Sequence, residues 1–371
     1  MLKEITQRGS PAQRSLALQT IATSGQIRSQ RTVWQAGSAM MAATVSAGNK
    51  QRAIYDARQG SQLPGILVRS EGDAPATDIA VNEAYDGAGV TFDLYYGVYG
   101  RNSIDNNGLK LNSTVHYQKS YDNAFWDGGQ MVYGDGDEDL PPAQRLFNRF
   151  TISIDVIGHE LTHGVTQYEA NLNYSNQPGA LNESFSDVFG SLVKQYQLQQ
   201  TADQADWLIG QGLLTANVNG VGLRSMKAPG TAYNDPVLGR DPQPDSMSGY
   251  VTTTEDSGGV HINSGIPNRA FYTTAVEIGG FAWQKAGLIW YKTLSEKLNT
   301  NSNFQNAADL TFQTAGEIYG VGSLEQNAVA KGWQAVGITV NASGGIPTPQ
   351  PQPQPGPGCL TAVLRIFGLA R

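Results

Sequence analysis

The sequence predicts an α+β protein of two domains, with a mainly β N-terminal domain and a mainly α C-terminal domain. Its 371 residues, 40% of them hydrophobic, suffice to bury one large core or two moderate ones. Between residues 53 and 132, β-branched and aromatic residues alternate with turn residues, whereas long helical patterns dominate from Thr151 onward. The single cysteine, Cys359, excludes an intrachain disulfide, so packing or metal binding must stabilise the fold.

The N-terminal segment is basic and the rest of the chain is acidic. Residues 1–58 contain eight Lys or Arg and two acidic residues, a net charge of +6, which leaves 17 basic and 30 acidic residues for the remainder. Ser10, Pro11 and Gln13 form a helix-start pattern that predicts a helix over residues 11–24. Residues 28–50 are polar and small, which predicts an exposed connection. The segment is either a solvated basic stretch or a prosegment lying on an acidic cleft.

The central segments predict strands first and helices later. Strands are expected in RAIYDARQ, GILVRS, GVTFDLYYGVYG and STVHYQKS, the last with His116 as a strand histidine. Helices are expected over residues 180–199, 270–298 and 303–319. The proline-rich stretch from Asn341 predicts an extended linker before a short tail, to which no function is assigned.

The stretch IDVIGHELTHGVTQY, Ile154–Tyr168, contains two of the four histidines, with Glu160 between His159 and His163. On a helix of about 3.6 residues per turn, these histidines share one face about 6 Å apart along the axis, so both can reach one metal ion. Glu160 lies beside that face, where it can contact a metal-bound water. The alternative is a helix whose histidines make only core hydrogen bonds.

A second helical pattern supplies two carboxylates. Only His116 and His261 occur outside the motif, which favours a carboxylate as the third metal ligand. Glu183 and Asp187 are four residues apart and face the same way, so one can bind the metal while the other accepts the second ring N–H of a histidine ligand. Two histidines and one glutamate leave a position for water, which is typical of a catalytic zinc site.

With these motifs the sequence resembles the thermolysin family, peptidase family M4. The resemblance runs from about Arg69 to Gly337 and includes HELTHGVTQYEANLNYSNQPGALNESFSDVFG, NAFWDGGQMVYGDGD, LRSM and GGVHINSGIPNRAFY. The basic segment with KEITQRGSPAQRSLALQT is similar to the protealysin branch, whose propeptides are short. The resemblance implies a thermolysin-like (gluzincin) fold with the HExxH helix at the cleft between the domains, and the two-histidine, one-glutamate zinc set is that of thermolysin itself.

The resemblance also implies roles for individual residues. The implied zinc ligands are His159, His163 and Glu183, with Glu160 as general base and Asp187 orienting His159. Tyr174 and His261 match residues that stabilise the oxyanion, and Asp256 matches the residue that holds His261 in its charged or correctly oriented form. Positions that match residues holding the substrate backbone are Asn123, Ala124 and Arg224.

Calcium binding is where the chain departs most from thermolysin. The family's paired-calcium site draws on carboxylates at positions that here are Asp155, Lys194, Asp206, Leu208 and Gln211, so three of the five carboxylates are replaced. We expect the double calcium site to be absent, with the ammonium of Lys194 between Asp155 and Asp206 in its place. Calcium binding elsewhere in the chain remains open.

The sequence therefore predicts a zinc-dependent neutral endopeptidase made as a zymogen, which acts on proteins or peptides and prefers apolar P1′ residues. Its own propeptide is expected to inhibit it by covering the cleft and to be cut between Ile27 and Arg52. The predicted divisions are a propeptide over 1–50, a mainly β domain over 51–155, a mainly α domain over 156–340 and a linker and tail over 341–371. The alternatives are a catalytically silent zinc-binding interaction module and an aminopeptidase.

The composition of the chain limits the possible binding partners and cellular location of the protein. A net charge of −7 argues against nucleic acid as a partner, and no apolar run approaches the length of a membrane span. The start MLKEITQRGSPAQRS lacks the apolar core of a secretory signal. We therefore expect secretion by a route without a classical signal peptide, with a cytoplasmic zymogen as the alternative.

Overall fold

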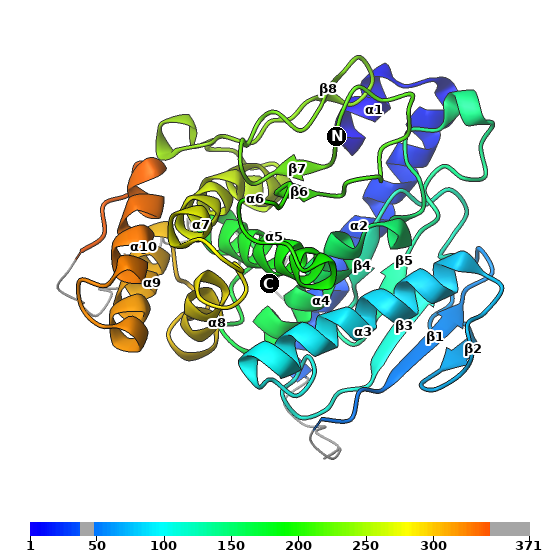
Figure 1. The fold of residues 1–371 in the computed structure, drawn as a ribbon. Helices are drawn as coiled ribbons and strands as arrows, with labels where there is room; N and C mark the ends of the chain where they lie inside the picture. The colour runs from blue at the N-terminus through cyan, green and yellow to red at the C-terminus, as the bar shows by residue number, and fades with distance from the viewer. Residues whose placement is uncertain (38–47, 342–371) are drawn as a thin grey trace, which may run out of the picture.

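The computed structural model describes residues 1–37 and 48–341, without the side chains of residues 28–37 (Figure 1). The predicted linker and tail beyond residue 341 lie outside the described residues. In the described part, no helix is both long and apolar enough to cross a membrane.

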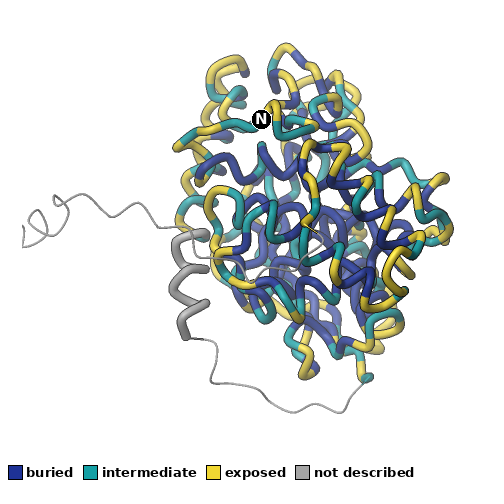
Figure 2. Tube along the Cα trace, turned by 90° about the vertical axis from the view of Figure 1, so that its left-hand side faces the viewer, coloured by how far each residue is buried: buried dark blue, intermediate teal, exposed yellow. Residues whose placement is uncertain are grey.

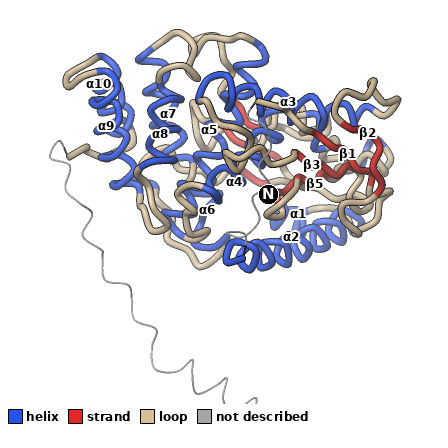
Figure 3. The backbone as a smooth tube through the Cα atoms, turned by 90° about the horizontal axis from the view of Figure 1, so that it is seen from below, coloured by secondary structure: helices blue, strands red, loops and turns tan. Residues whose placement is uncertain are grey.

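The N-terminal segment forms two helices, α1 (Leu2–Arg8) and α2 (Pro11–Gly37). The predicted capping box is confirmed, because the Ser10 N–H donates to Gln13 Oε1 at 2.8 Å and the Gln13 N–H donates to Ser10 Oγ at 3.4 Å. The predicted end of this helix at residue 24 was wrong, because α2 continues to Gly37 through part of the stretch predicted as a connection. Figure 3 shows α1 and α2 along one side of the molecule, beside α4 and the strands β3 and β5.

Five strands form a mixed sheet in the order β2-β1-β3-β5-β4. β1 runs parallel to β3 and β3 runs parallel to β5, whereas β1–β2 and β4–β5 are antiparallel. The strands are β1 (Arg52–Asp56), β2 (Ile66–Ser70), β3 (Leu111–Val115), β4 (Ala124–Trp126) and β5 (Met131–Tyr133). β4 therefore lies at an edge of the sheet, with one side unpaired.

The prediction of a strand in GVTFDLYYGVYG was wrong, because these residues belong to the helix α3 (Ile79–Tyr99). Val81, Tyr85, Ala88, Phe92 and Tyr95 recur at intervals of three or four residues and are all buried, so their burial against the sheet and α4 decides the structure. The strand preference of valine and tyrosine contributes less free energy than this packing. The Asp78 side chain caps the N-terminus of α3 by accepting from the Ala80 N–H at 2.9 Å.

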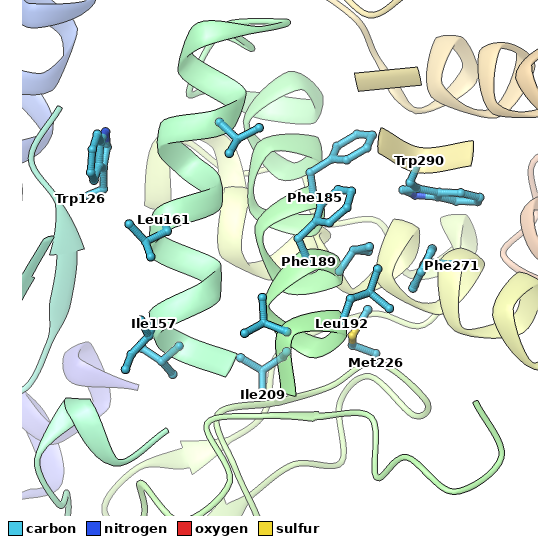
Figure 4. Packing of buried hydrophobic residues seen from close by; sticks show 14 of the residues in the cluster. Trp126, Ile157, Leu161, Phe185, Phe189, Leu192, Ile209, Met226, Phe271 and Trp290 are labelled. Carbon is cyan, nitrogen blue, oxygen red and sulfur yellow. The ribbon is translucent and has the colours of Figure 1, made fainter. Parts of the chain in front are cut away.

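The helices α4 (Ile154–Tyr168) and α5 (Asn176–Leu198) pack closely in the centre of the molecule (Figure 4). Glycine allows this approach, since a Cβ atom on Gly190 would lie 2.3 Å from the Asp155 carbonyl oxygen. Leu161 of α4 and Phe185 and Phe189 of α5 are fully buried in the surrounding core. This contact fixes the position of α4 relative to α5.

The remaining elements cover the C-terminal half. The helix predicted over 270–298 is broken at Gly279 and Gly280, which have φ angles of 73° and 67°. The elements are β6 (Leu208–Ile209), β7 (Arg224–Ser225), β8 (Asn234–Asp235), β9 (Gly239–Arg240), α6 (Asp256–Asn263), α7 (Gly265–Ile278), α8 (Ala286–Glu296), α9 (Phe304–Tyr319) and α10 (Leu324–Ala335). Short 3-10 helices cover Pro142–Gln144, Phe150–Ile152 and Met247–Gly249.

A sheet-bearing N-terminal half and a helical C-terminal half confirm the predicted α+β class. Figure 2 shows buried residues in the interior of the molecule and exposed residues mainly at its surface.

Candidate metal centre and active-site pocket

The helix α4 carries His159 and His163 on one face, one turn apart. Their Nε2 atoms lie 3.1 Å from each other, and both side chains are buried. Glu183 of α5 faces them, with Oε2 3.5 Å from His159 Nε2 and Oε1 3.4 Å from His163 Nε2. One donor atom from each of the three residues lies within 4.8 Å of the others, so they form a group able to hold one metal ion.

The outer ring nitrogens of both histidines are held by other side chains. His159 Nδ1 lies 2.7 Å from Asp187 Oδ1, as the sequence predicted. His163 Nδ1 lies 2.7 Å from Asn182 Oδ1 and 3.0 Å from Ser186 Oγ. Because an Nδ1–H donates outward in each ring, the Nε2 lone pairs point toward Glu183.

Sequence reasoning missed Asn182. Its position in the sequence could have indicated this role, because Asn182 lies next to Glu183 and four residues before Ser186 on the predicted helix. A second histidine ligand also needs a partner for its outer nitrogen.

Asp187 is the centre of a buried polar network. Besides His159, it accepts from Arg224 Nε at 2.8 Å, from Arg224 Nη2 at 2.6 Å and from Asn268 Nδ2 at 2.8 Å. Burial would raise the pKa of Asp187, but the charge of Arg224 and the hydrogen bonds from Arg224 and His159 lower it well below its usual range. The carboxylate therefore stays ionised and can fix the orientation of His159. The contacts of Arg224 in this structure go to Asp187, and its action on substrate remains a prediction.

Glu160 lies at the rim of the three-residue group. Its Oε2 accepts from the backbone N–H of Trp126 at 3.1 Å, and its Oε1 lies 4.0 Å from His159 Nε2. A carboxylate held at this distance can exchange a proton with a small molecule near the histidines.

Tyr174 and His261 lie on the other side of the same group. The hydroxyl of Tyr174 hydrogen-bonds to Glu183 and lies 3.2 Å from His261 Nε2, while His261 Nδ1 lies 2.6 Å from Asp256 Oδ1. Burial would lower the pKa of His261, but Glu183 and Asp256 raise it to about 9. Protonated His261 and Tyr174 thus offer two donors in one place.

A pocket opens onto the metal-ligand group and the side chains beside it. Its lining includes Asn123 and Ala124 of the edge-strand region, the metal-ligand group, Glu160, Tyr174 and His261. It also includes Ser24 and Ile27 of α2, so the N-terminal segment reaches the pocket. Ser24 Oγ accepts from Asn123 Nδ2 at 3.1 Å.

Two family models match this chain. The model of the thermolysin metallopeptidase catalytic domain matches residues 28–167, and that of the thermolysin metallopeptidase alpha-helical domain matches residues 170–338. The chain belongs to the thermolysin family of metallopeptidases. Like the rest of the thermolysin family, it is a metalloendopeptidase that hydrolyses peptide bonds.

Relatives and a solved structure agree with the thermolysin-family assignment. An extracellular metalloprotease of Pectobacterium carotovorum subsp. carotovorum is 55% identical over 295 residues, which cover 79% of this chain and 83% of that protein. Protease PrtS of a Photorhabdus species is 51% identical over 292 residues, covering 78% and 76% of the two chains. The solved precursor of protealysin from Serratia proteamaculans is 52% identical, has a TM-score of 0.81 and covers 91% of this chain and 97% of its own.

The residues present fit the zinc ion that the thermolysin family uses. Glu183 is 1% exposed, and its buried Oε2, 3.5 Å from His159 Nε2, has no hydrogen-bond partner among the residues that the structure describes. A bound cation would supply the missing partner for this oxygen. The mixed nitrogen and oxygen donors are those that zinc prefers at catalytic sites.

Proposed function

We propose that this protein is a zinc-dependent endopeptidase made as a zymogen. The observation that carries the proposal is the convergence of Glu160, Tyr174 and His261 on one buried metal-ligand group in one pocket. A silent zinc-binding module needs the ligands but has no need of a proton acceptor and two oxyanion donors beside them. This convergence supports catalysis over that alternative.

In the proposed reaction His159, His163 and Glu183 hold zinc. The ion, when bound, supplies a Lewis acid that lowers the pKa of a coordinated water and polarises the substrate carbonyl. Glu160 accepts the proton of the attacking water and returns it to the leaving amine. Tyr174 and His261 donate hydrogen bonds to the oxyanion, and Asp256 keeps His261 oriented and charged.

We propose that substrates are proteins or peptides whose backbone is held by Asn123, Ala124 and Arg224. The preference for apolar P1′ residues is proposed from the resemblance to the thermolysin family. The extracellular relatives support action outside the cell. The proposed divisions are a leader over 1–50, a first domain over 51–155, a second over 156–340 and a linker and tail over 341–371.

We propose that the leader (residues 1–50) inhibits the enzyme by covering its cleft. In support, Ser24 accepts a hydrogen bond from the amide of Asn123. Ile27 lines the pocket and packs against the hydrophobic cluster of Tyr117, Tyr121, Phe125 and Val132. At the other end of the leader, Lys3 forms an ion pair with Glu255, the residue before Asp256. The predicted cleavage interval, 27–52, includes residues 38–47, which lie outside the described residues. A cut before β1 leaves the sheet intact.

We propose that Lys194 replaces the family's double calcium site. In support, Lys194 Nζ lies 2.9 Å from Asp155 Oδ2, 2.9 Å from Asp206 Oδ1 and 3.0 Å from the Leu208 carbonyl oxygen. An ammonium bonded to three oxygens supplies positive charge where the family binds cations. Calcium titration of the chelator-treated protein should reveal no tight pair of ions near Asp155, and two tight sites there would contradict the proposal.

The test of the proposed function compares the wild type with Glu160→Ala. On the same samples, mass spectrometry shows whether the leader is still attached, and metal analysis measures the bound zinc. Hydrolysis of an end-blocked peptide measures internal cleavage. We expect the wild type to lose its leader and cut the peptide, and the variant to bind zinc, stay full length and be inert. If both bind zinc and neither cuts after the leader has been trimmed by an added protease, the proposal is wrong.

A further inference from the structure

The helix that carries His261 begins with a backbone that few residues adopt. The first residues of α6 have φ angles in the left-handed region, at 50° for Asp256, 53° for Ser257, 87° for Gly258 and 78° for Gly259. Glycine takes such angles readily, whereas the first two residues are strained by them. A strained backbone persists only where its surroundings hold it in place. The position of His261 therefore depends on contacts with the rest of the molecule.

His261 is held at both ends of the residue. On one side Asp256 Oδ1 lies 2.6 Å from the ring Nδ1, and Asp256 Oδ2 accepts from the His261 N–H at 2.8 Å. On the other side the His261 carbonyl oxygen accepts from Gln243 Nε2 at 2.8 Å and from Ser264 Oγ at 3.1 Å. This carbonyl lies in the last turn of α6, where carbonyl groups need partners from outside the helix. Gln243 supplies one from a distant part of the chain.

The loop that carries Gln243 is itself firmly anchored. The Gln243 N–H donates to Asp241 Oδ1 at 3.1 Å, and Asp241 Oδ2 accepts from the Gly230 N–H at 3.1 Å. The next residue packs directly on the start of α7, since a Cβ atom on Gly265 would lie 2.7 Å from the Pro244 carbonyl oxygen. The amide of Gln243 therefore reaches His261 from a fixed base.

The side chain of Gln243 has one satisfied end and one unsatisfied end. It is 5% exposed, and its Nε2 also donates to Ser264 Oγ at 3.0 Å. Its Oε1 is buried and has no hydrogen-bond partner among the residues that the structure describes. A buried polar atom without a partner lowers stability by an amount comparable to what such hydrogen bonds contribute. Net stability therefore does not account for this glutamine, whereas its contact with His261 does.

We propose that Gln243 is a positioning residue for His261: by holding the main-chain carbonyl of His261, it sets the place from which the imidazole Nε2 donates. The inference rests on the proposed function, in which His261 and Tyr174 donate to the oxyanion. His261 Nε2 lies 3.2 Å from the Tyr174 hydroxyl, so the two donors converge while the main chain of His261 stays in place. A donor displaced by about 1 Å stabilises the transition state less and changes the binding of the uncharged substrate little.

A double-mutant cycle with the end-blocked peptide tests the proposal. All chains are made with their leader and trimmed by the same added protease, so slow self-maturation does not affect the rates. Gln243→Met keeps the length of the side chain without its donor and should lower kcat by about tenfold, with KM within about twofold of the parent. His261→Ala should lower kcat by about 100-fold. In the His261→Ala chain, Gln243→Met should not lower kcat further, because no imidazole is left to position.

Gln326→Met is the matched control. Gln326 is 6% exposed and its Nε2 donates to the Phe312 carbonyl oxygen at 3.2 Å, so this change also removes a bond from a buried amide to the main chain. Gln326 lies on α10 and does not line the pocket, so its kcat should equal that of the parent. Urea unfolding of every chain measures the loss of stability separately, and that of Gln243→Met should be the same with and without His261.

An unchanged kcat of Gln243→Met would overturn the proposal. A tenfold loss that persists in the His261→Ala chain would also overturn it, because a general structural defect does not depend on the imidazole. If Gln243→Met does not fold, Gln243→Asn replaces it in the cycle, since it keeps an amide but draws the donor back by one methylene. A His261→Ala chain as active as the parent would instead refute the role of His261 in the proposed function, and that result comes from the single variant alone.

Discussion

The contacts of His116 predict that the protein loses stability as the pH rises from about 6.5 to 9. His116 follows β3 directly, with a φ of 55°. Its Nδ1 lies 2.8 Å from Asp135 Oδ2, and its Nε2 lies 2.7 Å from Asp78 Oδ2. Because Asp78 also caps α3, protonated His116 joins the start of that helix to the turn after β5.

The size of the effect follows from the pKa. The hydrogen bond that His116 donates to Asp135, with the charges of both carboxylates, outweighs burial and raises the pKa of His116 from 6.5 to about 9. A raised pKa in the folded state means that the stabilisation is fully present below the unfolded pKa and is lost as the pH rises through the folded pKa. Each unit is worth about 1.4 kcal/mol, so about 3 kcal/mol disappears between pH 6.5 and 9. The side chain is only 23% exposed, so solvent screens little of this.

Urea unfolding of the Glu160→Ala chain, which removes self-digestion, measures the effect. His116→Gln should cost about 3 kcal/mol of unfolding free energy at about pH 6 and almost nothing at about pH 9.5. Lys119→Gln removes an exposed positive charge nearby and should leave the pH dependence of the parent unchanged. An equal cost of His116→Gln at both pH values would refute the reasoning.

Three further predictions concern the helices α4 and α5. Lys194→Met leaves Asp155 buried and unpaired and should lower the free energy of unfolding by about 3 kcal/mol; a urea midpoint close to that of the parent would contradict the ion-pair argument. Asn182→Ala should weaken zinc binding by about 10- to 100-fold in chelator competition, because His163 loses an outer partner, and unchanged affinity would show that Ser186 alone suffices. Gly190→Ala should lower the free energy of unfolding by about 1–3 kcal/mol, because the new methyl group forces α4 and α5 apart. Gly25→Ala places its methyl group in open space and should not lower the free energy of unfolding in the same urea titration.

The histidine pair of the metal-ligand group was predictable from the sequence because its geometry is local, whereas the resemblance to the thermolysin family implied Glu183 as the third ligand. His159 and His163 are one turn apart on any α-helix, and the spacing of Glu183 and Asp187 gives them one face of the next. The capping box at Ser10 is also local, since its hydrogen bonds join residues three apart. Such features depend on the backbone of one element and change little with the rest of the fold.

The tertiary structure decided what depends on residues far apart in the chain. α3 is a helix because its buried face packs against the sheet and α4, and this packing overrides the strand preference of its valines and tyrosines. Arg224 donates to Asp187, and Asn123 donates to Ser24, only because elements far apart in the chain pack against one another. The sequence by itself determined which residues could bind a metal ion and exchange a proton, because local spacing sets those possibilities. Long-range packing, which no local pattern encodes, decided which partners hold those residues and that Ser24 and Ile27 of the N-terminal segment line the same pocket.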